Sequence, residues 1–156
     1  MAVQPIPSGY HTVTPYLIVH DAKAALEFYQ KAFGADQVLR LDAPDGKIAH
    51  AEVKIGDSHV MFADEHPEMG AISPKTLGGA GVNLLIYCED VDTQFQQAID
   101  AGATQRRPVQ DQFYGDRAGT LEDPFGHKWS IATHKEDLTP EEIDARFAEM
   151  MQQSGG

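Results

Sequence analysis

A strand followed by a helix and a glycine occurs twice in this chain, and this repeat constrains the fold more than any other feature. The first copy runs from Tyr16 to Ala35, and the second runs from Leu85 to Ala103. In both copies an aspartate stands before the helix, at Asp21 and Asp90, where a side-chain oxygen can cap the first turn. A glycine ends each helix, as left-handed C-caps require. A unit repeated at an offset of about 69 residues predicts a duplicated architecture.

Each copy is followed by alternating strands that end in hairpins, so each repeat reads as a βαβββ module with its helix on one face of a curled sheet. We place module one at about residues 12–64 and module two at about residues 82–134. The segment 65–81, rich in proline and glycine, is the expected linker. A helix of about residues 139–153 follows, introduced by a Thr-Pro-Glu-Glu capping box. The whole chain, 1–156, is predicted to form a single domain.

Composition excludes several classes of partner. A net charge of −12 without any basic run argues against nucleic acid and against an anionic membrane. The N-terminus carries no signal-peptide pattern, and no segment approaches the length of a membrane span. Cys88 is the single cysteine, which fits a reducing compartment, and we expect it to be a small buried hydrophobe rather than a nucleophile. The cytoplasm is the expected location.

The hairpin at Gly56-Asp57 allows the faces of module one to be predicted. If Ile55 opposes Ser58, then Glu52 opposes Met61 and Lys54 opposes His59. One face is then apolar and must pack under the helix; it comprises Ala49, Ala51, Val53, Ile55, Val60 and Phe62, with Val13, Leu17 and Val19 from the first strand. The other face is polar and comprises Thr14, Tyr16, Ile18, His50, Glu52, Lys54, His59 and Met61. Such a face either meets water or, if the sheet curls, lines a cup that holds a small molecule.

The second hairpin has a longer turn. Pairing Glu122 with His127 places Gly119 opposite Ser130, so that Arg117 and Ser130 share a face. Arg117 is then either a fixed cation for a carboxylate, phosphate or enolate oxygen of a ligand, or a partner for Asp116 or Glu122 at the surface.

Several motifs together resemble the vicinal oxygen chelate superfamily, which includes glyoxalase I, the bleomycin-resistance proteins, fosfomycin-resistance enzymes and extradiol dioxygenases. The resemblance rests on the helix end FYQKAFGA, the segment Tyr87–Asp92 and the turn DPFGHKW that begins at Asp123. The run from Thr12 to His134 looks like the PhnB-like branch. The resemblance implies an α+β fold in which tandem βαβββ modules form a curled, incompletely closed eight-stranded sheet, with a C-terminal helix added.

The family's metal site takes one residue from the first strand and one from the last strand of each repeat. By alignment these positions are Thr14, Met61, Asn83 and Ser130. None of them is the His, Glu or Gln that the metal enzymes place there, and thioether and hydroxyl groups are poor ligands for their metals. We therefore expect no inherited metal site and no cofactor.

Four functional hypotheses follow. The first is a metal-independent protein that binds a small polar organic ligand through Tyr16, His50, His59, Met61, Asn83, Phe113, Tyr114, Arg117 and Ser130. Of these, Phe113 and Tyr114 could equally be hydrophobic loop anchors. The second is a divalent-metal lyase or isomerase with a relocated site at His50, Glu52 and His59, although Lys54 opposite His59 disfavours a dication.

The third hypothesis is a lyase or isomerase without metal, in which Glu52 is the general base and Arg117 stabilises an enolate. The fourth is an interaction module without catalysis. In the C-terminal helix, Ile143, Phe147, Met150 and Met151 form an apolar stripe that must cover either its own sheet or a second subunit. We therefore expect a homodimer.

Overall fold

The computed structural model describes residues 2–155; Met1 and Gly156, the two ends of the predicted domain, lie outside the described residues. Module one contains β1 (Tyr16–Val19), α1 (Ala22–Phe33), β2 (Asp36–Asp42), β3 (Ile48–Ile55) and β4 (Ser58–Asp64). Module two contains β5 (Asn83–Tyr87), α3 (Val91–Ala101), β6 (Thr104–Asp111), β7 (Asp116–Glu122) and β8 (Lys128–His134). The linker holds η1 (Pro67–Met69) and α2 (Pro74–Leu77), and α4 (Pro140–Ser154) ends the chain.

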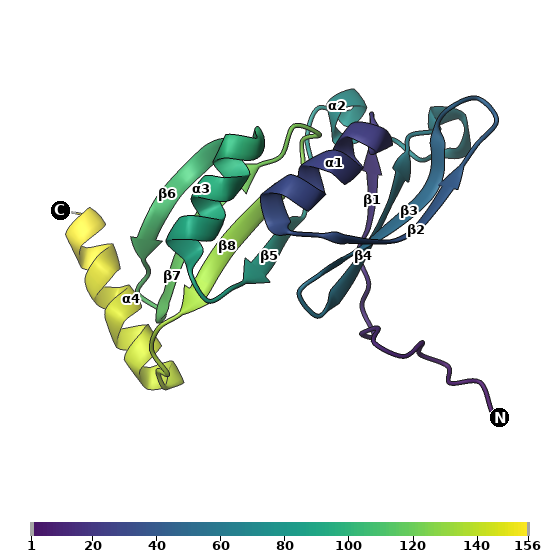
Figure 1. Ribbon diagram of the computed structural model, residues 1–156. Coiled ribbons are helices and arrows are strands. Elements are labelled where there is room, and N and C mark those ends of the chain that lie inside the picture. Colours follow the sequence, from purple (N-terminus) through teal and green to yellow (C-terminus); the bar gives the residue numbers. More distant parts are fainter. Residues whose placement is uncertain (1, 156) are drawn as a thin grey trace.

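The strands form two four-stranded mixed sheets with the same topology, in the orders β1-β4-β3-β2 and β5-β8-β7-β6. In each sheet the first and last strands of the module pair in parallel, and the other neighbours are antiparallel. The predicted α+β fold with tandem βαβββ modules is confirmed, and it forms no closed barrel. Figure 1 shows the two modules side by side, with α1 next to α3 and α4 at the far end of module two.

Each module begins its helix with the same pair of hydrogen bonds. Asp21 accepts from the amide of Ala24 at 3.1 Å, as the N-cap pattern predicts. A second acceptor comes from the end of the last strand: Asp64 receives the amide of Ala22 at 2.8 Å. In module two Thr133 receives the amide of Val91 at 2.9 Å. Asp64 is therefore a buried structural residue, although charged residues at strand ends are usually solvated.

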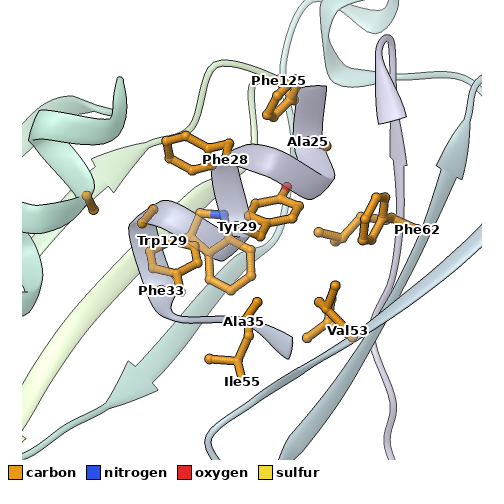
Figure 2. Packing of buried hydrophobic residues seen from close by; sticks show 14 of the residues in the cluster. Ala25, Phe28, Tyr29, Phe33, Ala35, Val53, Ile55, Phe62, Phe125 and Trp129 are labelled. Carbon is orange, nitrogen blue, oxygen red and sulfur yellow. The ribbon is translucent and has the colours of Figure 1, made fainter. Parts of the chain in front are cut away.

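One hydrophobic core joins the modules, because the aromatic side chains of α1 reach the second sheet. The rings of Phe33 and Trp129 lie 4.8 Å apart, and those of Tyr29 and Trp129 lie 5.6 Å apart. Figure 2 shows Phe28, Tyr29 and Phe33 grouped with Trp129, and Phe62 on the side of Tyr29. The hydroxyl of Tyr29 donates to Asp123 at 2.7 Å. Helix α1 is thus the central packing element of both halves.

The predicted register of the first hairpin is confirmed, with Glu52 opposite Met61 and Lys54 opposite His59. Two residues assigned to the buried face are exposed. Ala49 falls at a register shift in the β2–β3 pairing. Because of this shift, the side chain of Ile48 is buried in the core and that of Ala49 is exposed. Val13 lies before β1, which begins at Tyr16, and 84% of its surface is exposed.

The predicted register of the second hairpin is wrong by one residue. Glu122 pairs with Lys128, Thr120 with Ser130, and Arg117 with Thr133. The turn is closed by the amide of Asp123, which donates to the carbonyl of His127 at 2.8 Å, so His127 belongs to the turn. A one-residue slip moves side chains to the opposite face. Arg117 therefore lies on the face that carries the helix, and Ser130 lies on the other face.

The linker folds back over the junction between the modules. Its helix α2 contacts β1, and the turn at Gly126 leaves no room for a side chain, because a Cβ there would lie 2.8 Å from Pro74. Across residues 2–155, none of the helices has both the length and the apolar composition to cross a bilayer.

Candidate functional site

Each sheet has one face under the helices and one face away from them, which we call the open face. The strand register places Tyr16, Met61 and Glu52 in one row across the first sheet, and Leu85, Ser130 and Thr120 in the equivalent row of the second. Met61 and Ser130 thus occupy matching positions in the two modules, as the repeat offset predicts. The polar groups of module one are concentrated on its open face, in Tyr16, His50, Glu52, Lys54 and His59.

A buried carboxylate is the most unusual group on this face. Glu52 exposes 3% of its surface. Its Oε2 accepts the hydroxyl of Tyr10 and lies 3.2 Å from Nδ1 of His59. The Tyr10 ring stacks on the His59 imidazole, with 3.9 Å between centroids and 14° between planes. The hydrogen bond to Glu52 is the main reason that the pKa of Tyr10 is raised, so the phenol stays protonated.

His50 lies on the same face but bonds elsewhere. Its Nδ1 lies 2.9 Å from the hydroxyl of Tyr16. Within residues 2–155, no group of three His, Cys, Asp or Glu side chains is placed so as to hold a metal ion. The geometry therefore does not assemble His50, Glu52 and His59 into the ligand set that the relocated metal site requires.

A cavity of about 820 Å³ lies at the junction of the modules, next to His59. Module one contributes the strand ends around the β3–β4 turn and the segment before β1, and module two contributes β5. Thr14, His59 and Ser58 supply polar atoms, and Leu85 and Trp129 supply apolar walls. A hollow of this size with a few polar groups is typical of a small-molecule site. Glu52 does not line the cavity itself; it is linked to it through His59.

A second cavity of about 440 Å³ lies between β1 and β5 and is covered by the linker. Tyr16 lines it together with mainly apolar residues such as Leu17, Ile72 and Leu84. Several linker residues, among them Pro74 and Leu77, line one side of this cavity.

Arg117 lies away from Glu52. Its guanidinium makes two 2.9 Å bonds to Asp92 in the first turn of α3 and one 3.3 Å bond to Asp111. These bonds, the pair to Asp92 first, raise the pKa of Arg117. Arg117 lines a separate cavity, formed around the β6–β7 turn and the segment after β8. Arg117 therefore pairs with surface carboxylates, but these are Asp92 and Asp111 and not the predicted Asp116 or Glu122. The cavity that Arg117 lines is not lined by Glu52.

The remaining predicted residues are spread over module two. Ser130 shares a 3.1 Å hydrogen bond with Thr120, and Asn83 is exposed at the start of β5. Phe113 and Tyr114 lie in the turn between β6 and β7, where the Phe113 ring lies 5.4 Å from that of Phe147. Phe113 therefore anchors α4, which was the alternative role considered for it.

Sequence reasoning missed two groups of residues. Tyr10 was not included in the site, although it is an isolated aromatic beside a lead-in of prolines and glycine. His134 stands at the exposed end of β8, yet its Nδ1 lies 2.7 Å from the buried Asp116, which also accepts the hydroxyl of Tyr87. The Tyr10 contact joins a segment without secondary structure to a distant strand, which strand periodicity does not predict. Asp116 and His134 are instead register partners on the neighbouring strands β7 and β8, and the one-residue error in the register of the second hairpin concealed their contact.

Comparison with known proteins gives one family. The model of the Glyoxalase/Bleomycin resistance protein/Dioxygenase superfamily matches residues 10–131. An uncharacterized protein of Mycobacterium bovis is 41% identical over 139 residues, which are 87% of this chain and 91% of the relative. An uncharacterized protein of Mycobacterium tuberculosis is equally similar, over 87% of this chain and 82% of its own.

Among solved structures, TioX from Micromonospora sp. ML1 matches with a TM-score of 0.63 and 28% identity, over 80% of this chain and 98% of its own. A protein from Bacillus cereus described as a PhnB protein and putative 3-demethylubiquinone-9 3-methyltransferase matches with a TM-score of 0.60 and 20% identity. That match covers 79% of this chain and 99% of the other. At that identity the second likeness concerns the fold alone.

Proposed function

Because the chain belongs to the Glyoxalase/Bleomycin resistance protein/Dioxygenase superfamily, we propose that it binds a small polar organic molecule on the open face of module one, beside the cavity between the modules. The observation that carries this proposal is the buried Glu52 carboxylate, which bonds to Tyr10 and His59. Burying a charge is costly unless it is paired, so such a carboxylate outside the core favours a role in recognition.

The proposed binding does not use the metal of the family's enzymes. Thr14, Met61, Asn83 and Ser130 offer two hydroxyls, a thioether and an amide at the four aligned positions. Ser130 is already hydrogen-bonded to Thr120, and Thr14 donates to the carbonyl of His11 at 3.2 Å. This donor set does not fit the imidazole and carboxylate preference of the catalytic metals.

A fragment screen followed by amide NMR tests the proposal. We expect to find ligands that shift the amide resonances around Glu52 and His59. We expect Glu52→Gln to lower the affinity for these ligands at least tenfold. Glu89→Gln, an exposed carboxylate outside the site, is the matched control and should leave affinity unchanged. The proposal would be refuted if the screen finds no ligand that shifts these amides, or if Glu52→Gln and Glu89→Gln bind the ligands with equal affinity.

A second candidate function is catalysis by a lyase or isomerase with Glu52 as general base. The imidazole–carboxylate pair of His59 and Glu52 favours it, since such pairs carry protons in many enzymes. Arg117 is excluded from the enolate-stabilising role by its bonds to Asp92 and Asp111. Once a ligand is identified, single-turnover product analysis distinguishes catalysis from binding. A catalyst converts the ligand in the native chain and loses this activity in Glu52→Gln, whereas a binding protein releases the ligand unchanged.

We also propose that the chain is a homodimer in the cytoplasm. The apolar stripe of α4 is only partly covered by its own chain. Phe147 contacts Phe113 but is still 46% exposed, and Met151 is 53% exposed. Sedimentation equilibrium should give twice the monomer mass for the native chain and the monomer mass for Phe147→Glu with Met151→Glu. Glu141→Lys, at an exposed position in the first turn of α4, is the control. A native chain that sediments as a monomer would contradict the dimer.

A further inference from the structure

The segment before β1 crosses the β3–β4 hairpin as a strap, which we define as residues 7–14. The amide of Tyr10 donates to the carbonyl of Pro7 at 3.0 Å and forms a turn. Nε2 of His11 lies 3.1 Å from the carbonyl of Asp57, at the tip of the hairpin. The strap belongs to neither sheet and contributes no residue to the hydrophobic core.

Tyr10 makes the strap's most specific contact. The hydroxyl donates to a carboxylate, and the ring face lies flat on an imidazole. Both recognising groups, Glu52 and His59, stand on the rigid β3–β4 hairpin, where they already bond to each other. The binding groups therefore belong to the folded sheet, whereas the group they hold is on a segment packed against its surface.

We infer that Glu52 and His59 form a binding site for a neutral hydroxyl-bearing aromatic ring, and that Tyr10 is an intramolecular occupant which such a ligand displaces. This inference rests on the proposed function and names its ligand class. The imidazole selects a planar ring by stacking. The carboxylate selects a hydroxyl donor at the far end of that ring and rejects a ring without one, because the buried charge would lose its partner.

The negative charge of the site narrows the class of ligand further. Glu52 is itself a buried carboxylate, and the chain carries a net charge of −12. A phenolate or a carboxylate placed against Glu52 would meet a like charge in a poorly solvated position. The preferred ligand is therefore a phenol that is protonated at neutral pH, as Tyr10 is.

An internal occupant lowers the apparent affinity for a free ligand in proportion to the time it holds the site. Removal of the Tyr10 side chain should therefore strengthen phenol binding without any change to Glu52 or His59. The appropriate probe is p-cresol, which reproduces the tyrosine side chain, and toluene is its matched control without the hydroxyl.

The experiment titrates both probes into the native chain and into Tyr10→Ala, Tyr10→Phe and Tyr10→Ala with Glu52→Gln, followed by amide NMR. We expect p-cresol to bind Tyr10→Ala roughly tenfold or more tightly than the native chain, with Tyr10→Phe in between, on the scale of one hydrogen bond to a charge. The affinity for toluene should rise much less in Tyr10→Ala than the affinity for p-cresol. The double variant Tyr10→Ala with Glu52→Gln should no longer bind p-cresol more tightly than toluene. In the native chain, saturating p-cresol should move the amides of Gly9 and His11 as the strap leaves.

Three results would overturn the inference: no gain in Tyr10→Ala, an equal gain for toluene, or p-cresol binding to the native chain without movement of the strap. Circular dichroism of each variant checks that the fold is retained, and Tyr10→Phe still tests the hydroxyl if Tyr10→Ala does not fold. Failure of this inference can be distinguished from failure of the proposed function. A screen that finds only ligands without a phenol, still sensitive to Glu52→Gln, would retain that function and reject this ligand class.

Discussion

At the scale of single residues, Asp123 joins the two modules. Its Oδ2 accepts the Tyr29 hydroxyl at 2.7 Å and the Trp129 indole at 3.0 Å. Its Oδ1 accepts the amides of Phe125 and His127, each at 2.9 Å. Asp123→Asn keeps the shape but points an NH₂ group at two donors in either orientation. We expect it to lower the free energy of unfolding by about 2–4 kcal/mol, measured by urea denaturation.

Tyr29→Phe is the matched control for Asp123→Asn. It removes one donor and leaves Oδ2 bonded to Trp129, so the loss should be smaller, about 1–2 kcal/mol. Equal losses for the two variants would show that the Tyr29 hydrogen bond, rather than the set of four, accounts for the effect of Asp123.

His134 should make stability depend on pH. Its pKa is raised, first by the hydrogen bond to Asp116 and then by the one to Asp137, 2.8 Å away. A group with a higher pKa in the folded state stabilises fully below its unfolded value of 6.5, and the contribution is lost as pH rises through the folded pKa. We expect the native chain to lose stability over that range more steeply than His134→Gln. An NMR titration midpoint of His134 at or below 6.5 would contradict this.

At the scale of elements, α4 is held by a segment that packs against the β6–β7 turn. Gly115 has φ +100°, and a Cβ there would lie 2.6 Å from the carbonyl oxygen of Glu136. Glu136 in turn makes two 2.9 Å bonds to Arg146 of α4. We expect Gly115→Ala to cost about 2–3 kcal/mol and to speed amide exchange in α4, measured by hydrogen exchange mass spectrometry.

Gly46→Ala separates backbone strain from collision. Gly46 has a similar φ of +88°, but a Cβ there meets open space. Gly46→Ala should lower the free energy of unfolding by about 1–2 kcal/mol because of the left-handed backbone alone, and it should leave amide exchange in α4 unchanged. Faster exchange in α4 for both variants would mean that Gly115 does not act through Glu136.

The elements also show what periodicity can predict. The caps of both helices and the Gly56-Asp57 hairpin follow from local patterns, because capping and two-residue turns are decided within a few residues. The turn at Asp123 was misread because its closure depends on side-chain bonds within the loop. That error placed Arg117 on the wrong face, and no local signal indicated its bonds to Asp92.

The candidate site was predicted only in part for the same reason. Glu52 and His59 were correctly placed on one face by alternation along a hairpin. Tyr10 lies 42 residues from Glu52 in the chain and reaches it through a segment without secondary structure. Contacts of this kind depend on the tertiary path of the chain, which periodicity does not encode.

At the scale of the whole molecule, the shared core predicts that the modules unfold together. Trp129 is the single tryptophan, it lies in module two, and its ring contacts Tyr29 and Phe33 of module one. Its fluorescence therefore reports on the junction. Ile48 is buried in module one. Ile48→Ala should cost about 2–4 kcal/mol.

If the core is one cooperative unit, Ile48→Ala shifts the urea midpoints of Trp129 fluorescence and far-UV circular dichroism by the same amount. Ile131→Ala, at a buried position in module two, should do the same and serves as the matched control. A fluorescence midpoint that stays at its native value in Ile48→Ala, while the dichroism splits into two transitions, would show that the modules fold independently. In that case α1 would stabilise only its own sheet, and the cavity between the modules would open before either module unfolds.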